Sequence, residues 1–153
     1  MAVKSIRPSV ILIKDNKILV LKSEYSSGTF YLLPGGHIED METMPETAVR
    51  ETKEETGYDI KIKKLLYVQE WINIKRDKNV VYMVFLGEII EGNETHLLDP
   101  CLSEGHIQQI EWRTVSELKN EDFFPKNILA LLENDLASSF IKDAQMLSPD
   151  ITQ

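Results

Sequence analysis

The chain concentrates acidic side chains within residues 33–59, where eight carboxylates accompany one arginine and one lysine. Glu51, Glu54 and Glu55 are spaced at i, i+3 and i+4, which places them on one face of a helix. Each such like-charge pair destabilises an isolated helix by roughly 0.2–0.5 kcal/mol. Three carboxylates on one face suit a hard divalent cation such as Mg²⁺ or Mn²⁺, which takes oxygen ligands and activates bound water. The alternative is a solvated acidic face, the commoner role of charge runs.

The helix that would carry these glutamates is predicted over residues 43–56. One face is marked by small or apolar residues that recur every four positions, namely Met44, Ala48, Thr52 and Thr56. Thr43 and Glu46 form a capping-box pattern at its start, and Gly57 suits the left-handed conformation that ends a helix. The local sequence therefore specifies both ends of the helix.

Extended segments are predicted on both sides of this helix. They are a hairpin over 9–23 that turns at Asp15-Asn16, strands over 59–74 and 79–90 joined by a turn at 75–78, and a strand over 107–115. A second helix is predicted over 125–140, and the last ten residues are expected to be frayed. This order favours an α+β fold, with a mixed sheet and helices on both faces.

Size and composition narrow the class of protein. A chain of 153 residues is expected to form a single domain over 1–153. The net charge of −8 argues against binding to a nucleic-acid polymer, whereas an anionic small ligand remains compatible if a metal ion screens its charge. No run of 18 apolar residues is present, so we expect no contact with a membrane and a cytoplasmic location.

The glycines and charged residues around the helix follow a characteristic spacing. Gly36 is followed after five residues by Glu42, and after seven more by the run "RETKEETGY". Residues 36–58 thereby resemble the Nudix box of the Nudix (MutT-like) hydrolases, G-x5-E-x7-R-E-U-x-E-E-x-G-U, where U is a bulky aliphatic residue. All seven fixed Gly, Glu and Arg positions match, which makes the signal highly specific. Thr52 and Tyr58 depart at U; Thr52 should lose core contact, and Tyr58 needs a partner for its hydroxyl.

The resemblance implies a Nudix fold, an α/β/α sandwich with a mixed β-sheet between helices. It also implies a Mg²⁺-dependent (or Mn²⁺-dependent) pyrophosphohydrolase, in which water attacks phosphorus in the pyrophosphate linkage of a nucleoside diphosphate derivative. Nucleoside triphosphates and ADP-ribose-like molecules are both open as substrates. The alternative is a catalytically silent nucleotide-binding regulator, for which a lost box glutamate would be typical, whereas here the glutamates are complete. Homodimers are common among such relatives.

The resemblance also assigns roles to residues. Glu51, Glu54 and Glu55, with the backbone carbonyl of Gly36, become the metal ligands. Glu42 and Arg50 become an internal ion pair, with Arg50 turned one residue away from the ligand face, and Gly57 is structural. The general base is Glu54, Glu55 or Glu104, because "SEGHIQQIEW" resembles the family stretch from which a distant glutamate enters the site.

Weaker expectations concern substrate binding. Arg7 and Lys22 flank predicted strands, and His37 follows Gly36, so each is a candidate for a phosphate or base contact. The stretch "DFFPKN" resembles a segment that contacts a purine in some MutT-like proteins, which suggests Phe124 and Asn127. For all five residues the simpler interpretation is an exposed or packing position. Four aromatic residues are expected mainly in the core, with one of them free to stack on a base, namely Phe30, Tyr31, Trp71 and Tyr82.

Overall fold

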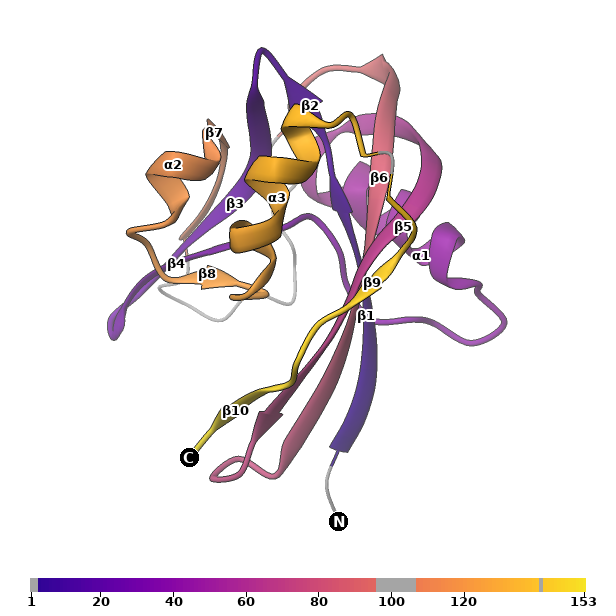
Figure 1. Ribbon diagram of the computed structural model, residues 1–153. Helices are drawn as coiled ribbons and strands as arrows, with labels where there is room; N and C mark the ends of the chain where they lie inside the picture. Colours follow the sequence, from indigo (N-terminus) through magenta and orange to yellow (C-terminus); the bar gives the residue numbers. More distant parts are fainter. Residues whose placement is uncertain (1–2, 96–106, 141) are drawn as a thin grey trace.

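The computed structural model describes residues 3–95, 107–140 and 142–153 of the chain (Figure 1). In chain order, its elements are β1 (Val3–Ile11), β2 (Ile13–Lys14), β3 (Lys17–Tyr25), β4 (Gly28–Leu32), α1 (Met44–Thr56), β5 (Tyr58–Asn73), β6 (Lys78–Gly92), β7 (Ile107–Arg113), α2 (Val115–Leu118), β8 (Phe123–Phe124), α3 (Ile128–Ala137), β9 (Gln145–Met146) and β10 (Asp150–Thr152). Within these described ranges, no helix has the length and apolar character that crossing a membrane requires.

The strands form two mixed sheets. The first has the order β1-β6-β5-β10, with β9 also paired to β5; β1 runs parallel to β6, and β5 antiparallel to β6. The second has the order β2-β3-β4-β8, with β7 on the other edge of β3. The predicted hairpin turn is present at Asp15 and Asn16, whose φ angles of 50° and 58° match a turn with positive φ at both positions. The expectation of mixed strands with helices is confirmed.

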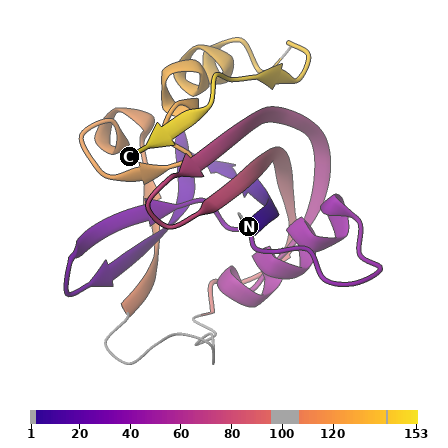
Figure 2. The same ribbon diagram turned by 90° about the horizontal axis from the view of Figure 1, so that it is seen from below.

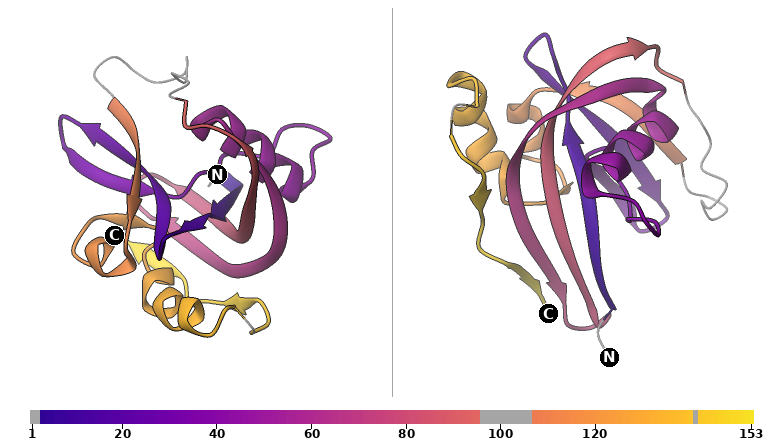
Figure 3. Two further views of the ribbon diagram at one scale, coloured as in Figure 1. Left: turned by 90° about the horizontal axis from the view of Figure 1, so that it is seen from above. Right: turned by 90° about the vertical axis from the view of Figure 1, so that its right-hand side faces the viewer.

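Side-chain alternation along the strands builds two cores, one on each face. In β3, Ile18 and Val20 join the cluster that contains α2 and α3, whereas Leu19 and Leu21 join the cluster that contains Ala48 of α1. Figure 2 and the right panel of Figure 3 accordingly show α1 on one side of the strands and α2–α3 on the other. One side of helix α1 therefore packs against this second core, and its other side faces solvent.

Helix α1 begins and ends as its local sequence predicts. The Thr43 backbone N–H donates to Glu46 Oε2 at 2.7 Å, the Glu46 N–H donates to Thr43 Oγ1 at 3.4 Å, and Gly57 has a φ of 82°. Its buried face consists of Thr47, Ala48, Thr52 and Thr56. The glutamates lie beside this face: Glu51 and Glu55 are half-buried, and Glu54 is exposed.

The two positions that depart from the box pattern are accommodated differently. Tyr58 is buried, and its hydroxyl donates to Glu94 Oε1 at 3.2 Å. Thr52 is also buried, but its hydroxyl has no hydrogen-bond partner in the described structure. The tyrosine is thus satisfied, whereas Thr52 leaves a polar atom unpaired under the helix.

The prediction that the last ten residues are frayed is wrong. Strands β9 and β10 both pair in parallel with β5, and the Leu147 N–H donates to the Val68 carbonyl at 2.9 Å. Buried Asp135 of α3 anchors the start of this segment, because its carboxylate accepts from Tyr67 Oη at 2.6 Å and Gln145 Nε2 at 3.1 Å. These long-range partners are absent from the local sequence pattern, which is why the segment looked unstructured.

Candidate active site

The loop between β4 and α1 passes very close to the acidic face of the helix. The Gly35 N–H donates to Glu55 Oε2 at 3.1 Å, and the Gly36 N–H donates to the Pro8 carbonyl at 3.2 Å. A Cβ atom on Gly36 would lie 2.2 Å from the carboxyl carbon of Glu51. Only glycine permits this approach, which brings the backbone of Gly36 beside Glu51.

Arg50 donates hydrogen bonds to three carboxylates, one from the loop and two from α1, and forms a longer ion pair with Glu39 at 3.7 Å. Its Nε and Nη2 donate to the two oxygens of Glu42 at 2.7 and 2.9 Å. Its Nη1 donates to Glu51 Oε1 at 2.9 Å and to Glu54 Oε2 at 3.3 Å. The guanidinium therefore reaches the predicted ligand Glu51 as well as Glu42 and Glu54.

These contacts set the charge of the site. Hydrogen bonds from Arg50 and then Thr47 lower the pKa of Glu42 from 4.5 to about 2. The side chain of Glu51 is only 18% exposed. This burial raises the pKa of Glu51, whereas the hydrogen bond from Arg50 lowers it. Glu54 is 57% exposed. Glu51 is thus a carboxylate in a partly dry environment, where a nearby cation would stabilise its charged form.

The residues present fit a divalent cation by their chemistry. Glu51 and Glu54 already share one positively charged donor, Nη1 of Arg50. The candidate donors are all oxygens, from Glu51, Glu54, Glu55 and the Gly36 carbonyl, as Mg²⁺ and Mn²⁺ require. Across residues 3–95, 107–140 and 142–153, however, no three acidic, His or Cys side chains are gathered into a ready ligand cluster. Binding would therefore require the glutamates to turn toward the ion.

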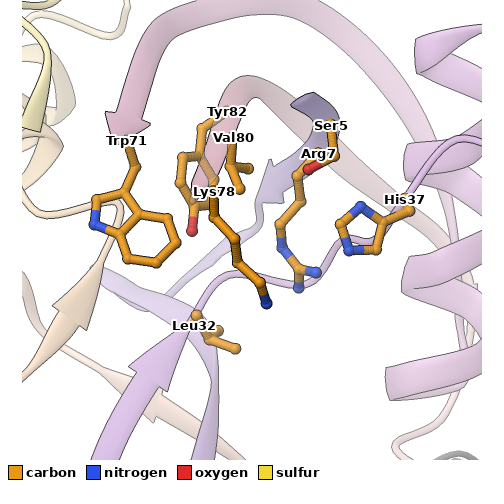
Figure 4. A pocket seen from close by; sticks show the side chains of 8 residues that line it. All are labelled: Ser5, Arg7, Leu32, His37, Trp71, Lys78, Val80 and Tyr82. Atoms are coloured by element: carbon orange, nitrogen blue, oxygen red, sulfur yellow. The ribbon is translucent and has the colours of Figure 1, made fainter. Parts of the chain in front are cut away.

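A pocket of about 520 Å³ opens beside this acidic face (Figure 4). It is lined by Ser5, Arg7, Leu32, His37, Trp71, Lys78, Val80 and Tyr82. Strand register explains the grouping, because Ser5 pairs with Val80 and Val80 with Trp71, while Arg7 pairs with Tyr82. Alternation along β1 and β6 then places Arg7, Lys78 and Tyr82 on the same face of the sheet.

His37 connects the pocket to the acidic face. Its carbonyl accepts from Arg50 Nη2 at 3.3 Å, and its ring lines the pocket. Partial burial, followed by the positive charges of Arg7 and Lys78, lowers the pKa of the His37 imidazole. The His37 ring therefore lies between the two basic side chains and the helix that carries the glutamates (Figure 4).

Two of the five expected substrate-binding residues line this pocket, namely Arg7 and His37. Lys22 does not; it lies in β3 and pairs with Glu24 at 2.8 Å. Phe124 is not among the lining residues either, but its ring packs edge-on against the lining residue Trp71 at a centroid distance of 6.4 Å. Asn127 is exposed at the start of α3, and Glu104 lies outside the described residues.

Sequence reasoning missed Lys78 and Ser5 and placed Trp71 among core candidates. Lys78 was expected to close a turn, yet it begins β6 and points into the pocket (Figure 4). The alternation of Lys78, Val80 and Tyr82 in "KNVVY" is the signal that could have shown a shared face. The register with β1 and β5 is not legible in the sequence.

Known proteins resemble the chain in sequence and in fold. An ADP-ribose pyrophosphatase of Methanocaldococcus jannaschii is 43% identical over 84 residues, which are 54% of this chain and 49% of that protein. The matched part thus spans about half the length of this curated relative. A NUDIX hydrolase from Nitrosomonas europaea superposes with a TM-score of 0.69 at 18% identity, covering 90% of each chain.

An ADP-ribose pyrophosphatase from Streptococcus suis gives a TM-score of 0.64 at 18% identity, covering 95% of this chain and 98% of that one. Likeness at such identities establishes the fold. The sequence profile of the NUDIX domain matches residues 5–132, which are most of the chain and include the whole box. The chain therefore belongs to the NUDIX domain family.

Proposed function

We propose that the protein is a divalent-metal-dependent hydrolase that cleaves the pyrophosphate linkage of a nucleoside diphosphate derivative of the ADP-ribose type. The observation that carries this proposal is that the acidic face of α1 and the pocket lie next to each other. The glutamates around Arg50 adjoin, through His37, a pocket with two basic and two aromatic side chains. A substrate with a flat base, a pyrophosphate and a second sugar would meet complementary groups along this path.

Each residue of the acidic face has a distinct task in this proposal. Glu51, Glu54 and Glu55 would hold the cation together with the Gly36 carbonyl. When bound, the cation supplies charge neutralisation at the pyrophosphate and lowers the pKa of a coordinated water. Arg50 orients Glu51 and Glu54 through its hydrogen bonds.

A carboxylate must accept the proton of the attacking water. Glu54 is exposed and accepts from Arg50 Nη1, and Glu55 accepts from the Gly35 N–H. Glu104 is the third candidate. The proton acceptor is therefore assigned to this set of three, which mutation can separate.

The substrate type rests on the pocket and on the relative from M. jannaschii, which is an ADP-ribose pyrophosphatase. Arg7 and Lys78 supply positive charge for phosphate, and Trp71 and Tyr82 supply aromatic surface for a base. Nucleoside triphosphates share the base and phosphates but carry more negative charge and no second sugar. They form the competing substrate class.

The test is turnover of a substrate panel. Purified protein is incubated with ADP-ribose, other nucleoside diphosphate sugars and nucleoside triphosphates, each with Mg²⁺ or Mn²⁺, and the released phosphorylated products are quantified. We expect ADP-ribose to give AMP and ribose 5-phosphate. Glu54→Gln and Glu55→Gln should each lower kcat, by about 100-fold or more for whichever is the base. Glu133→Gln, an exposed glutamate of α3, is the matched control.

Two results would contradict the proposal. If no member of the panel is cleaved but nucleotides bind, the protein is a nucleotide-binding regulator that retains the Nudix fold. If cleavage persists in both glutamate variants and without added metal, the acidic face is not the catalytic centre. Preference for triphosphates over ADP-ribose would shift the substrate class while preserving the hydrolase.

A further inference from the structure

A side-chain hydrogen bond connects the segment after α3 to the lining of the pocket. The Trp71 indole Nε1 donates to Thr152 Oγ1 at 3.2 Å. Strand β10 is held in register beside this tryptophan, because Asp150 pairs with Trp71 and the Ile74 N–H donates to the Thr152 carbonyl at 3.0 Å. The NUDIX profile ends at residue 132, so this strand lies outside the region that the profile matches.

The hydrogen bond restrains the orientation of the indole. One edge of the ring is tied to Thr152, and Phe124 packs against it with an interplanar angle of 69°. The ring also lines the pocket. Rotation of Trp71 would break the bond to Thr152 and the contact with Phe124, so the plane that faces the pocket is set by β10 as well as by β5.

The pocket changes character along its length (Figure 4). Trp71 and His37 lie at opposite ends, with the basic side chains of Lys78 and Arg7 between them. Beyond His37 follow Arg50 and the glutamates of α1. The order is therefore aromatic, basic, then acidic.

The two basic side chains are available to a ligand. Arg50 has carboxylate partners at 2.7–3.7 Å, whereas neither Arg7 nor Lys78 has an ion pair among the residues that the structure describes. Their charges lower the pKa of the His37 imidazole, and the charge of Arg7 also lowers the pKa of Glu51 from a longer range than an ion pair. Cations that have no ion-pair partner in a pocket favour an anionic ligand, and the guanidinium of Arg matches the geometry of phosphate in particular.

We propose that Trp71, positioned by Thr152 of strand β10, stacks on the base of the substrate, and that Arg7 and Lys78 bind the phosphate next to that base. Thr152 is a positioning residue, because it acts only through the indole. Strand β10 thereby determines specificity for substrates that carry a planar base. This inference rests on the proposed function for its substrate, but its binding step is measurable without turnover.

The binding test uses tryptophan fluorescence. The chain has two tryptophans, so Trp112→Phe leaves Trp71 as the single emitter. The probes are AMP, which has a base and a phosphate, and ribose 5-phosphate, which lacks the base. AMP should quench Trp71 emission saturably and ribose 5-phosphate should not. Arg7→Gln and Lys78→Gln should each weaken AMP binding while leaving the folded far-UV spectrum unchanged.

The positioning role is tested with three substitutions in β10. Thr152→Val removes the acceptor at nearly constant shape and should weaken AMP binding and raise KM for ADP-ribose about 2- to 10-fold, with kcat unchanged. Thr152→Ser keeps the hydroxyl and should restore wild-type values. Ile151→Ala removes an exposed neighbouring side chain and is the matched control. Trp71→Ala should raise KM about 5- to 100-fold.

The outcomes separate this inference from the proposed function. Saturable AMP quenching that Thr152→Val weakens, together with no turnover of any substrate, supports the inference and contradicts the hydrolase. ADP-ribose turnover with identical KM in Thr152→Val, Thr152→Ser and wild type overturns the inference alone. Equal loss in Thr152→Val and Ile151→Ala also overturns it, because the strand would then act only through general stability.

Discussion

Arg50 and Glu42 are joined by two parallel hydrogen bonds, from Nε to Oε1 at 2.7 Å and from Nη2 to Oε2 at 2.9 Å. The planar guanidinium matches the carboxylate, and its remaining donor reaches Glu51 and Glu54. One side chain thus ties the loop that carries Glu42 to the acidic face of α1. Its geometry affects the orientation of two predicted metal ligands at once.

Arg50→Lys should lower kcat about 10- to 100-fold, although the charge is retained. Lysine presents a point charge and cannot make the paired contact with Glu42 while also reaching Glu51. Lys119→Arg, at an exposed ion pair with Glu133, is the control and should leave kcat unchanged. Steady-state rates with ADP-ribose measure the effect, and wild-type activity in Arg50→Lys would show that the bidentate geometry is unimportant.

The stability contributed by Glu42 should disappear in acid. Its pKa is about 2 in the folded protein against an ordinary value of 4.5. A depressed folded pKa gives stability that is fully present above the unfolded value, and that is lost as pH falls from 4.5 toward 2. Urea unfolding across this window should therefore show a weaker pH dependence in Glu42→Gln than in wild type. Parallel curves would mean that other carboxylates cause the acid sensitivity.

Gly36→Ala should weaken Mn²⁺ binding about 10- to 100-fold, because the new methyl group displaces the Glu51 carboxylate. Isothermal titration calorimetry with the metal alone measures the affinity. In a Glu51→Gln background the ligand is already lost, so Gly36→Ala should add little. Additive losses in the double variant would mean that the glycine acts through some other contact.

Thr52→Val should stabilise the protein by about 1 kcal/mol. The substitution preserves shape and removes a buried hydroxyl that has no partner in the described structure. Thr56→Val is the matched control: this hydroxyl donates to the Thr52 carbonyl at 2.6 Å and accepts from the Tyr58 N–H at 3.2 Å, so its loss should destabilise. Denaturant unfolding compares the two, and stabilisation by both would indicate a general preference for valine.

The sequence by itself determined the features that depend on residues close together in the chain. The capping pair Thr43 and Glu46, the terminal Gly57 and the spacing of the glutamates specify helix α1, because these effects act over one or two helical turns. The spacing from Gly36 to Tyr58 identified the family. The resemblance to that family also implied the ion pair between Arg50 and Glu42, which the structure contains.

Only the tertiary structure decided which segments, far apart in the sequence, lie side by side and line the pocket. Arg7, Trp71, Lys78 and Tyr82 meet because β1 pairs with β6 and β6 with β5, and strand register depends on the whole sheet. The same cause placed Lys22 outside the pocket and turned the expected frayed end into β9 and β10. Helix chemistry can be read from neighbours in the chain, whereas the pocket depends on strand pairings between residues far apart in sequence.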